Sequence, residues 1–177
     1  MGSLFCWEQL DSLKKESFLK QISEIFFEAS LKKTFTDLEA KENFFNLWCG
    51  QYIETFPREF WLMLDIDGAV LGYLCGCSEY TKLQGLPGYE LFEEEMKNFP
   101  AHLHINIATK SRGQGVGRRL VDKYLEGMRS ESCSGVFIIT SVRAANNGFY
   151  ERLNFNFTKI KKLIEEPLLF MGRSLNI

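Results

Sequence analysis

Residues 102–128 join a strand pattern to a helix pattern through a glycine-rich turn. Over 102–107, Leu103, Ile105 and Ile107 alternate with polar residues, which predicts a half-buried strand. After the turn, apolar residues recur at helical spacing and predict an amphipathic helix. They are Val116, Leu120, Val121, Tyr124, Leu125 and Met128. Together with the apolar run at 136–139, which predicts a strand parallel to the first, this order is typical of an α/β protein.

The turn carries a glycine at every second position: Gly113, Gly115 and Gly117. Arg112 and Arg118 lie beside these glycines. Glycine lets the backbone approach a ligand closely, and free N–H groups at the start of a helix favour an anion. The turn therefore predicts a site for a phosphate-bearing ligand. An ordinary strand-to-helix turn is the alternative that the glycine spacing alone leaves open.

Two well-known phosphate loops do not fit this turn. The P-loop requires GxxxxGK followed by Ser or Thr, and the sequence contains no such run. The dinucleotide fingerprint requires GxGxxG and an acidic residue about 20 positions later. Here the glycines are spaced GxGxG, and the next predicted strand, residues 136–140, is followed by Ser141.

The turn instead resembles the (Q/R)xxGxG/A signature of the GNAT acetyltransferase superfamily, in the form Arg112-x-x-Gly115-x-Gly117. About thirty residues later, the segment NNGFYERLNF from Asn146 to Phe155 resembles the N…FYERLGF segment of that family. The two segments come in the order of the family, with a predicted strand between them. The resemblance covers about residues 60–157, and the N-terminal part is matched by element order alone.

This resemblance implies a single domain over residues 1–177 with an α/β (α+β) fold of GNAT type. Helices would flank a central mixed, mostly antiparallel sheet in which two parallel strands splay apart. It implies acetyl-CoA, or coenzyme A, as the co-substrate, without a metal. The loop would hold the pyrophosphate, and the pantetheine arm would pair with the backbone of the preceding strand. The expected CoA-binding residues are Ile105, Ile107, Arg112, Gly113, Gln114, Gly115, Val116, Gly117, Arg118, Asn146 and Asn147.

Acyl transfer needs a neutral amine, donors for the oxyanion and a proton for the leaving thiolate. The resemblance implies that Tyr150 lies beside the sulfur of CoA, so we expect Tyr150 to be the acid. Packing in a short amphipathic helix is the alternative for this tyrosine. The chain has two histidines, His102 and His104, and these are the candidates for the base because histidine titrates near neutral pH. A structural role for each histidine stays open.

We therefore expect an acetyl-CoA-dependent N-acetyltransferase that transfers an acetyl group to a primary amine by direct attack on the thioester. A non-catalytic acyl-CoA-binding or sensing domain is the alternative. More narrowly, PAHLHIN and GQGVGRRLV resemble the acetyltransferase-like domains of O-GlcNAc hydrolases and their free-standing bacterial relatives. Those proteins commonly carry aspartate where this chain has Asn106, whose amide cannot act as a base. The segment between Ser141 and Phe149 also looks shorter than the family norm.

The N-terminal third has the pattern of two helices. Asp11 or Ser12 can cap the first, whose apolar positions would be Leu19, Ile22, Ile25 and Phe26. Residues 36–39 have the spacing of a capping box for a second, aromatic-rich helix that should end before Pro57. We interpret the aromatic residues of this helix as core, with Trp48 and Tyr52 as alternative walls of an acceptor pocket.

Two hairpins are also expected. Strands over 60–65 and 70–78 should be joined at Asp67-Gly68, and strands over 155–164 and 168–175 at Glu166-Pro167. The glycines at positions 72 and 76 should mark a bulge or a close backbone approach.

Charge and composition exclude several classes of protein. The formal net charge is −2, which gives no broad basic field for nucleic acid. No apolar run is long enough to span a membrane, and the five cysteines are scattered without a metal-binding pattern. We expect a cytoplasmic protein with reduced thiols that acts on a small-molecule amine or a lysine-like acceptor, and we leave a homodimer open. An acidic cluster could attract a cationic acceptor or form a solvated helix face: Glu90, Glu93, Glu94 and Glu95.

Overall fold

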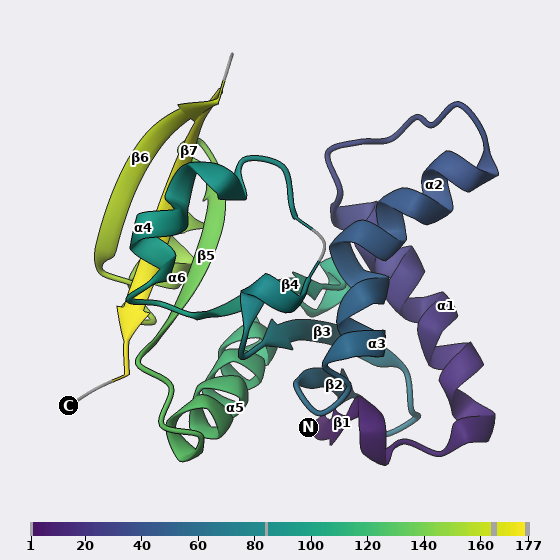
Figure 1. The fold of residues 1–177 in the computed structure, drawn as a ribbon. Helices are drawn as coiled ribbons and strands as arrows, with labels where there is room; N and C mark the ends of the chain where they lie inside the picture. Colours follow the sequence, from purple (N-terminus) through teal and green to yellow (C-terminus); the bar gives the residue numbers. More distant parts are fainter. Residues whose placement is uncertain (1, 84, 164–165, 176–177) are drawn as a thin grey trace. The chain divides into compact units, whose positions relative to one another are not determined.

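The computed structural model describes residues 2–83, 85–163 and 166–175 (Figure 1). The strands are β1 (Ser3–Cys6), β2 (Phe60–Leu64), β3 (Val70–Cys77), β4 (Ala101–Ile107), β5 (Gly135–Ser141), β6 (Phe157–Leu163) and β7 (Glu166–Ser174). The helices are α1 (Ser12–Ala29), α2 (Leu38–Phe45), α3 (Gln51–Thr55), α4 (Glu93–Met96), α5 (Val116–Ser130) and α6 (Asn147–Glu151). Single 3₁₀ turns are η1 (Trp7–Gln9), η3 (Tyr80–Lys82), η4 (Tyr89–Phe92) and η5 (Thr109–Ser111), and η2 (Asn46–Gly50) is a π-helical turn.

The chain forms two compact units, which are described in turn. The first contains Met1–Gly76 and His104–Tyr124, and the second contains Cys77–Leu103 and Leu125–Ile177. Backbone hydrogen bonds link the strands in the order β1-β2-β3-β4-β5-β7-β6. Strand β4 and helix α5 each contribute residues to both units. This mixed sheet with flanking helices confirms the expected α/β class.

The sheet of the first unit is built on a hairpin. Strand β2 pairs antiparallel with β1 and with β3. The chain reverses at Asp67-Gly68, where Gly68 has a φ of 83° that favours glycine. This turn confirms the hairpin that the Asp-Gly dipeptide predicts.

Two glycines of β3 allow neighbouring elements to come close to its backbone. A Cβ atom on Gly72 would lie 2.6 Å from Cδ1 of Ile107 on β4. A Cβ atom on Gly76 would overlap the ring of Tyr124 on α5. The sequence predicts a bulge or a close approach at these glycines, and the structure shows the close approach at both positions.

Helix α1 is capped by Asp11, whose carboxylate accepts a hydrogen bond from the Leu13 amide at 3.0 Å. Its buried face consists of Phe18, Ile22, Ile25 and Phe26. The expectation for Leu19 was wrong, because this side chain is 38% exposed. Phe18 takes the buried place since it precedes Ile22 by four residues and so lies on the same face.

The second helical segment is divided into α2, the π-helical turn η2 and α3. The predicted capping box at Thr36 was wrong. Asp37 is the N-cap, and its carboxylate accepts from the Ala40 amide at 2.7 Å. Helix α3 ends at Thr55, which confirms the expected end before Pro57. Tyr52 is completely buried and belongs to the core.

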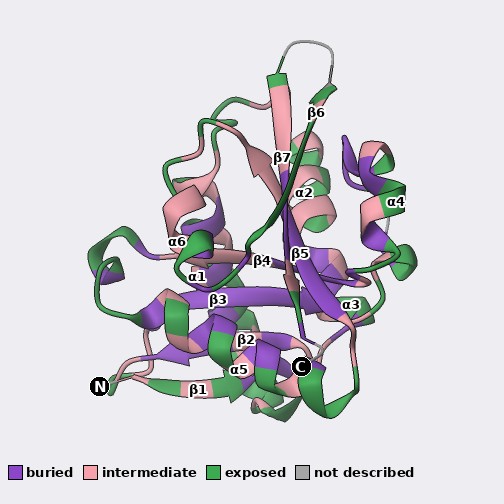
Figure 2. Ribbon diagram, turned by 90° about the vertical axis from the view of Figure 1, so that its left-hand side faces the viewer, coloured by how far each residue is buried: buried purple, intermediate pink, exposed green. Residues whose placement is uncertain are grey.

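The second unit contains the parallel strand pair. Ala101 and His102 of β4 pair with Val136 and Phe137 of β5, which confirms the predicted parallel orientation. Strand β7 pairs antiparallel with both β5 and β6. The rings of Phe137 and Phe170 stack in the core with centroids 5.0 Å apart. In Figure 2, β6 is mostly exposed, whereas much of β5 is buried.

The C-terminal hairpin differs from its prediction in one respect. Glu166 and Pro167 already belong to β7, where they pair with Leu163 and Lys162. Glu166 and Pro167 are therefore not the turn, and residues 164–165 between the two strands lie outside the described residues. Asn154, which follows α6, has a φ of 61°, in the left-handed region that asparagine tolerates.

None of the helices in the described residues is long and apolar enough to cross a membrane.

We predict that Gly76→Ala destabilises the protein by about 1–3 kcal/mol, because the new methyl group would overlap the buried Tyr124 ring. Gly127→Ala is the matched control, since a Cβ atom there meets nothing within 4 Å. This exchange within α5 should instead stabilise the protein by about 0.5–1 kcal/mol. Urea denaturation of both variants measures the two effects. Equal stability of the two variants would contradict the close approach at Gly76.

Candidate active site

The turn between β4 and α5 has the backbone geometry of an anion cradle. Gly113 and Gly115 have φ values of 74° and 79°, in the left-handed region that favours glycine. A Cβ atom on either glycine would meet nothing within 4 Å, so the space beside this backbone is open. Helix α5 begins at Val116, and its first N–H groups have no acceptor within the helix. An anion beside this turn would therefore meet free N–H donors and the positive end of the helix.

The side chains of the turn are held mostly by backbone oxygens. Arg112 donates from Nε to the carbonyl oxygen of Ile107 at 3.2 Å, and Gln114 donates to that of Lys110 at 2.8 Å. Arg118 lies 3.5 Å from the carboxylate of Asp122, one helical turn further along. Arg112 and Arg118 are exposed, so their positive charge is available to a ligand in solution.

Helix α1 supports the start of this turn. The Thr109 amide donates to Oε2 of Glu28 at 3.5 Å. The pKa of Glu28 is lowered by its hydrogen bonds with Thr109 and by the positive charges of Arg112 and Lys33. Since a lowered pKa keeps this carboxylate charged, Glu28 remains an acceptor for the turn at neutral pH.

His104 and Asn106 share one face of β4 in the first unit. Nδ2 of Asn106 lies 3.0 Å from Nε2 of His104 and 2.8 Å from the hydroxyl oxygen of Tyr73 on β3. The ring centroids of His104 and Trp48 are 6.2 Å apart, and both side chains are half-buried. Burial lowers the pKa of His104 to about 4. This histidine is therefore uncharged at neutral pH.

Tyr73 is the functional candidate that the sequence does not reveal. It is completely buried, and burial and the nearby thiols of Cys49 and Cys75 raise its pKa well above the ordinary value. The Sγ atoms of these cysteines are 3.7 Å apart. Tyr73 lies in an almost uninterrupted apolar strand, so no local pattern distinguishes it from the core residues. The hydroxyl group of Tyr73 becomes a functional candidate only because Asn106, on the neighbouring strand β4, donates a hydrogen bond to it.

The second unit places Tyr150 and Asn147 on the short helix α6. Tyr150 is buried against the rings of Phe149 and Phe155, and burial raises its pKa. Nδ2 of Asn147 donates to the carbonyl oxygens of Ser141 and Val142, each at 3.2 Å.

The amide oxygen of Asn147, Oδ1, is buried and has no hydrogen-bond partner among the described residues. A buried acceptor without a partner is costly unless a ligand supplies an N–H group. Asn146 precedes the helix as its N-cap residue, is exposed, and its side chain makes no capping bond.

His102 occupies a different environment from His104. It is 2% exposed, its Nε2 atom lies 2.7 Å from the hydroxyl oxygen of Tyr89, and its ring packs on Phe137 at 4.9 Å. These contacts within the second unit favour a structural role over that of a base, since a base needs access to the substrate.

The acidic cluster on α4 is partly neutralised within the second unit. Glu95 lies 2.8 Å from Nζ of Lys161, and Glu94 lies 2.6 Å from Nζ of Lys97. These contacts favour the interpretation as a surface helix face over an acidic rim for a cationic acceptor. In the part of the chain that the structure describes, His, Cys, Asp and Glu form no group of three or more that could hold a metal.

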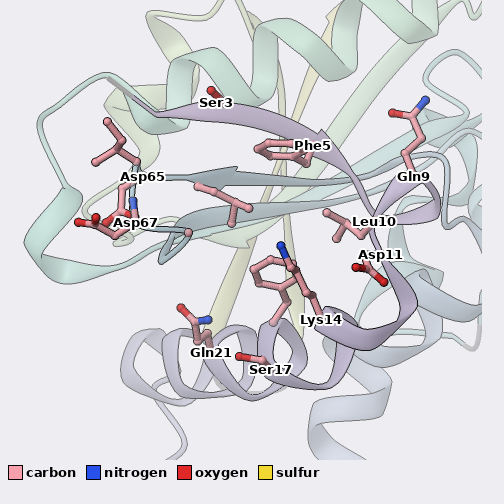
Figure 3. Close-up of a pocket in the computed structure, with 14 residues that line it drawn as sticks. Ser3, Phe5, Gln9, Leu10, Asp11, Lys14, Ser17, Gln21, Asp65 and Asp67 are labelled. Carbon is pink, nitrogen blue, oxygen red and sulfur yellow. The ribbon is translucent and has the colours of Figure 1, made fainter.

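Two pockets lie in the first unit. Residues of β1, α1 and the β2–β3 turn line a pocket of about 790 Å³, with Phe5, Lys14 and Gln21 around it (Figure 3). None of the residues expected to bind CoA or to act in catalysis lines this pocket. A smaller pocket of about 260 Å³ includes Glu28, Ala108 and Lys110, at the start of the candidate anion turn.

Solved structures with the same fold cover nearly the whole chain. SsHAT matches with a TM-score of 0.73 and 17% identity over 99% of both chains. The NatC complex bound to Gag peptide and CoA contains a chain that matches with a TM-score of 0.63 and 15% identity over 99% of both chains. The ribosomal-protein-S18-alanine N-acetyltransferase from Escherichia coli matches with a TM-score of 0.62 and 14% identity, over 100% of this chain and 96% of that one.

Comparisons of sequence identify the family directly. No curated protein sequence matches the chain. The family model for the acetyltransferase (GNAT) family, however, matches residues 16–155, which include β4, the glycine turn, α5 and α6. The chain therefore belongs to the acetyltransferase (GNAT) family, whose members transfer an acetyl group from an acyl-CoA donor.

Proposed function

We propose that this protein is an acetyl-CoA-dependent N-acetyltransferase that acts on a primary amine by direct attack on the thioester. The observation that carries this proposal is the turn at Gly113 and Gly115, whose left-handed backbone and open surroundings suit a pyrophosphate. Arg112 and Arg118 would neutralise part of its charge, and the N–H groups of Gln114 through Gly117 would donate to its oxygens.

The pantetheine arm of CoA carries amide groups that need hydrogen-bond partners. The backbone of Ile105 and Ile107 is our candidate for one set of partners, and the carbonyl oxygen of Ile107 now accepts from Arg112. The buried Oδ1 atom of Asn147 is our candidate for another, because it is an acceptor that lacks an N–H donor among the described residues. We include Asn146 in the CoA site on the family resemblance alone.

In the proposed reaction, the amine nitrogen bonds to the acetyl carbon, the C–S bond breaks and CoA leaves as the thiolate. We assign to Tyr150 the role of donating a hydrogen bond, and then a proton, to this thiolate. Because burial raises the pKa of Tyr150, the phenol holds its proton throughout the working pH range. His102 is buried against Tyr89, and the low pKa of His104 makes it a weak base. We therefore assign removal of the amine proton to solvent water.

The class of acceptor is proposed from the relatives of similar fold. Among the relatives of similar fold, one is named for a ribosomal-protein alanine and another is bound to a peptide. We therefore propose an amine of a peptide or a small molecule, or a lysine-like side chain. The narrower resemblance to the acetyltransferase-like domains of O-GlcNAc hydrolases, and the homodimer, stay predictions. A non-catalytic CoA-binding domain is the alternative, and it would bind CoA without releasing free thiol from acetyl-CoA.

CoA should raise the melting temperature of the wild-type protein in a dose-dependent manner, because a ligand of the native state stabilises it. Gly115→Ala should remove most of this shift, since alanine disfavours the φ of 79° that the turn requires. Gly68→Ala is the matched control, with a φ of 83° and equally open surroundings in the β2–β3 hairpin. It should lower the melting temperature without CoA by a similar amount and keep the CoA shift. A wild-type protein that shows no shift with CoA would overturn the proposed function.

Tyr150→Phe keeps the buried ring and removes only the hydroxyl group. We expect the turnover number to fall by about 10²-fold, the scale of a lost general acid, with little change in CoA affinity. Tyr80→Phe, in the same unit, is the control, and it should keep its turnover because its ring contacts with Tyr89 and Phe137 survive. Steady-state release of CoA thiol measures both variants. Unchanged turnover in Tyr150→Phe would show that Tyr150 has only a packing role in the core.

A further inference from the structure

The amide group of Asn106 divides its two hydrogens between two acceptors. Its Nδ2 atom lies 2.8 Å from the hydroxyl oxygen of Tyr73 and 3.0 Å from Nε2 of His104. An amide nitrogen donates and has no lone pair to offer, so both partners must accept. Nε2 of His104 therefore presents its lone pair to Asn106. A neutral imidazole that accepts at one nitrogen carries its proton on the other, here Nδ1.

The Tyr73 side of this arrangement is rigidly packed. Tyr73 is completely buried, and its ring stacks on Phe60 with centroids 5.7 Å apart. Its hydroxyl group also forms a hydrogen bond with the side chain of Cys49. Nδ2 of Asn106 donates to the hydroxyl oxygen of this packed tyrosine, so the nitrogen of the amide is the atom that reaches Nε2 of His104. The orientation of the amide then determines which nitrogen of His104 carries the proton.

We propose that Asn106 is a positioning residue that fixes His104 as a neutral ring with its proton on Nδ1, so that His104 donates a hydrogen bond to the substrate and does not remove a proton from it. This inference rests on the proposed function and specifies the chemistry of its acceptor side. His104 is half-buried beside Trp48, so part of its ring remains accessible to a bound molecule. The substrate atom that it meets should be an oxygen with a free lone pair, such as that of a carbonyl or hydroxyl group.

The groups that surround His104 preserve this neutral state. Trp48 contacts the ring from η2, and Asn106 lies on the same strand. The titratable groups next to Asn106 are Tyr73 on β3, which it contacts directly, and the two cysteines near Tyr73, Cys75 on β3 and Cys49 on η2. Burial, without any charged partner, is the cause that lowers the pKa of His104 to about 4. The imidazole is therefore neutral above about pH 5, where the enzyme would work.

The position of the proton can be measured directly by NMR. The chain has two histidines, so long-range ¹H–¹⁵N spectra of the uniformly labelled protein are simple, and His104→Gln identifies the His104 signals. The expected result is a neutral ring with the proton on Nδ1 from about pH 5.5 to 9. A proton on Nε2, or titration of His104 near its ordinary pKa, would overturn the proposal. This measurement needs no acetyl-CoA, so its outcome is independent of whether the proposed function holds.

Asn106→Asp reverses the hydrogen bond with little change in shape. A carboxylate only accepts, so Nε2 must carry the proton, and the neutral ring then has a lone pair on Nδ1. The carboxylate also raises the pKa of His104, and the same NMR titration measures its new value. Below the pKa of His104 in this variant, the ring is an imidazolium and carries a proton on Nδ1. As the pH rises through this pKa, the ring loses the Nδ1 proton.

Kinetics of the variant then distinguish a donor from a base by the sign of the pH effect. The assay uses the primary amine that releases CoA fastest from acetyl-CoA, and the readout is the ratio of kcat/KM for Asn106→Asp to that of the wild type. If His104 donates, this ratio should fall about tenfold as the pH rises through the pKa of the variant. A ratio that rises with pH would show that His104 is the base, and a constant ratio would show that it does not act on the substrate.

Asn156→Asp is the matched control, because Asn156 is exposed in the segment before β6. It makes the same chemical change and adds the same charge. Its kcat/KM ratio to the wild type should stay constant with pH. A pH-dependent ratio in this control would assign the effect to net charge and overturn the role of Asn106.

Discussion

The close approach of β4 and α5 to the backbone of β3 is the constraint on which the candidate site depends. Gly72 leaves room for Ile107 at the end of β4, and Gly76 leaves room for Tyr124 of α5. The turn from Arg112 to Gly117 joins these two elements, which both pack against the same strand. A side chain at either glycine would displace one of the two elements. The N–H groups that would face an anion would then change position as well.

A rigid frame of this kind explains how an open turn can hold a fixed shape. Gly113 and Gly115 have a left-handed backbone, and a Cβ atom on either would meet nothing within 4 Å. Hydrogen bonds at the start of the turn support its geometry: the Thr109 amide donates to Glu28, and Arg112 donates to the carbonyl oxygen of Ile107. An anion bound there would meet donors that are already oriented, which lowers the cost of ordering them on binding.

Strand β4, which precedes the proposed anion turn, carries a polar face whose side chains are kept uncharged. His104 is neutral because its partial burial lowers its pKa, and complete burial raises the pKa of Tyr73. Burial therefore favours hydrogen bonding over proton transfer at this face. A histidine in such surroundings is better suited to orient a substrate than to deprotonate an amine.

The sequence predicts the elements with a strong period or a distinctive dipeptide. The α5 stripe, the Asp-Gly hairpin and the parallel β4–β5 pair agree with the structure. The errors occur where neighbouring residues compete for one role. Asp37 displaced Thr36 as the helix cap, and Phe18 displaced Leu19 on the buried face of α1.

The candidate site could be predicted only in part, for a physical reason. The glycine turn depends on local backbone conformation, which the spacing of glycines records. The environments of His102 and His104 depend on partners that are distant in sequence, namely Tyr89 for the first and Trp48 for the second. Two histidines that appear equivalent on one strand therefore lie in different environments, and no local pattern indicates this difference.

The most direct test of direct acetyl transfer follows the acetyl group itself. The wild-type protein would be incubated with acetyl-CoA that carries a ¹³C-labelled acetyl group and with a panel of primary amines and peptides, and the products would be identified by mass spectrometry. Our account predicts labelled amide on at least one amine, formed together with an equal amount of CoA and without label on the protein. CoA binding without any labelled amide, or label retained on a cysteine of the protein, would contradict it.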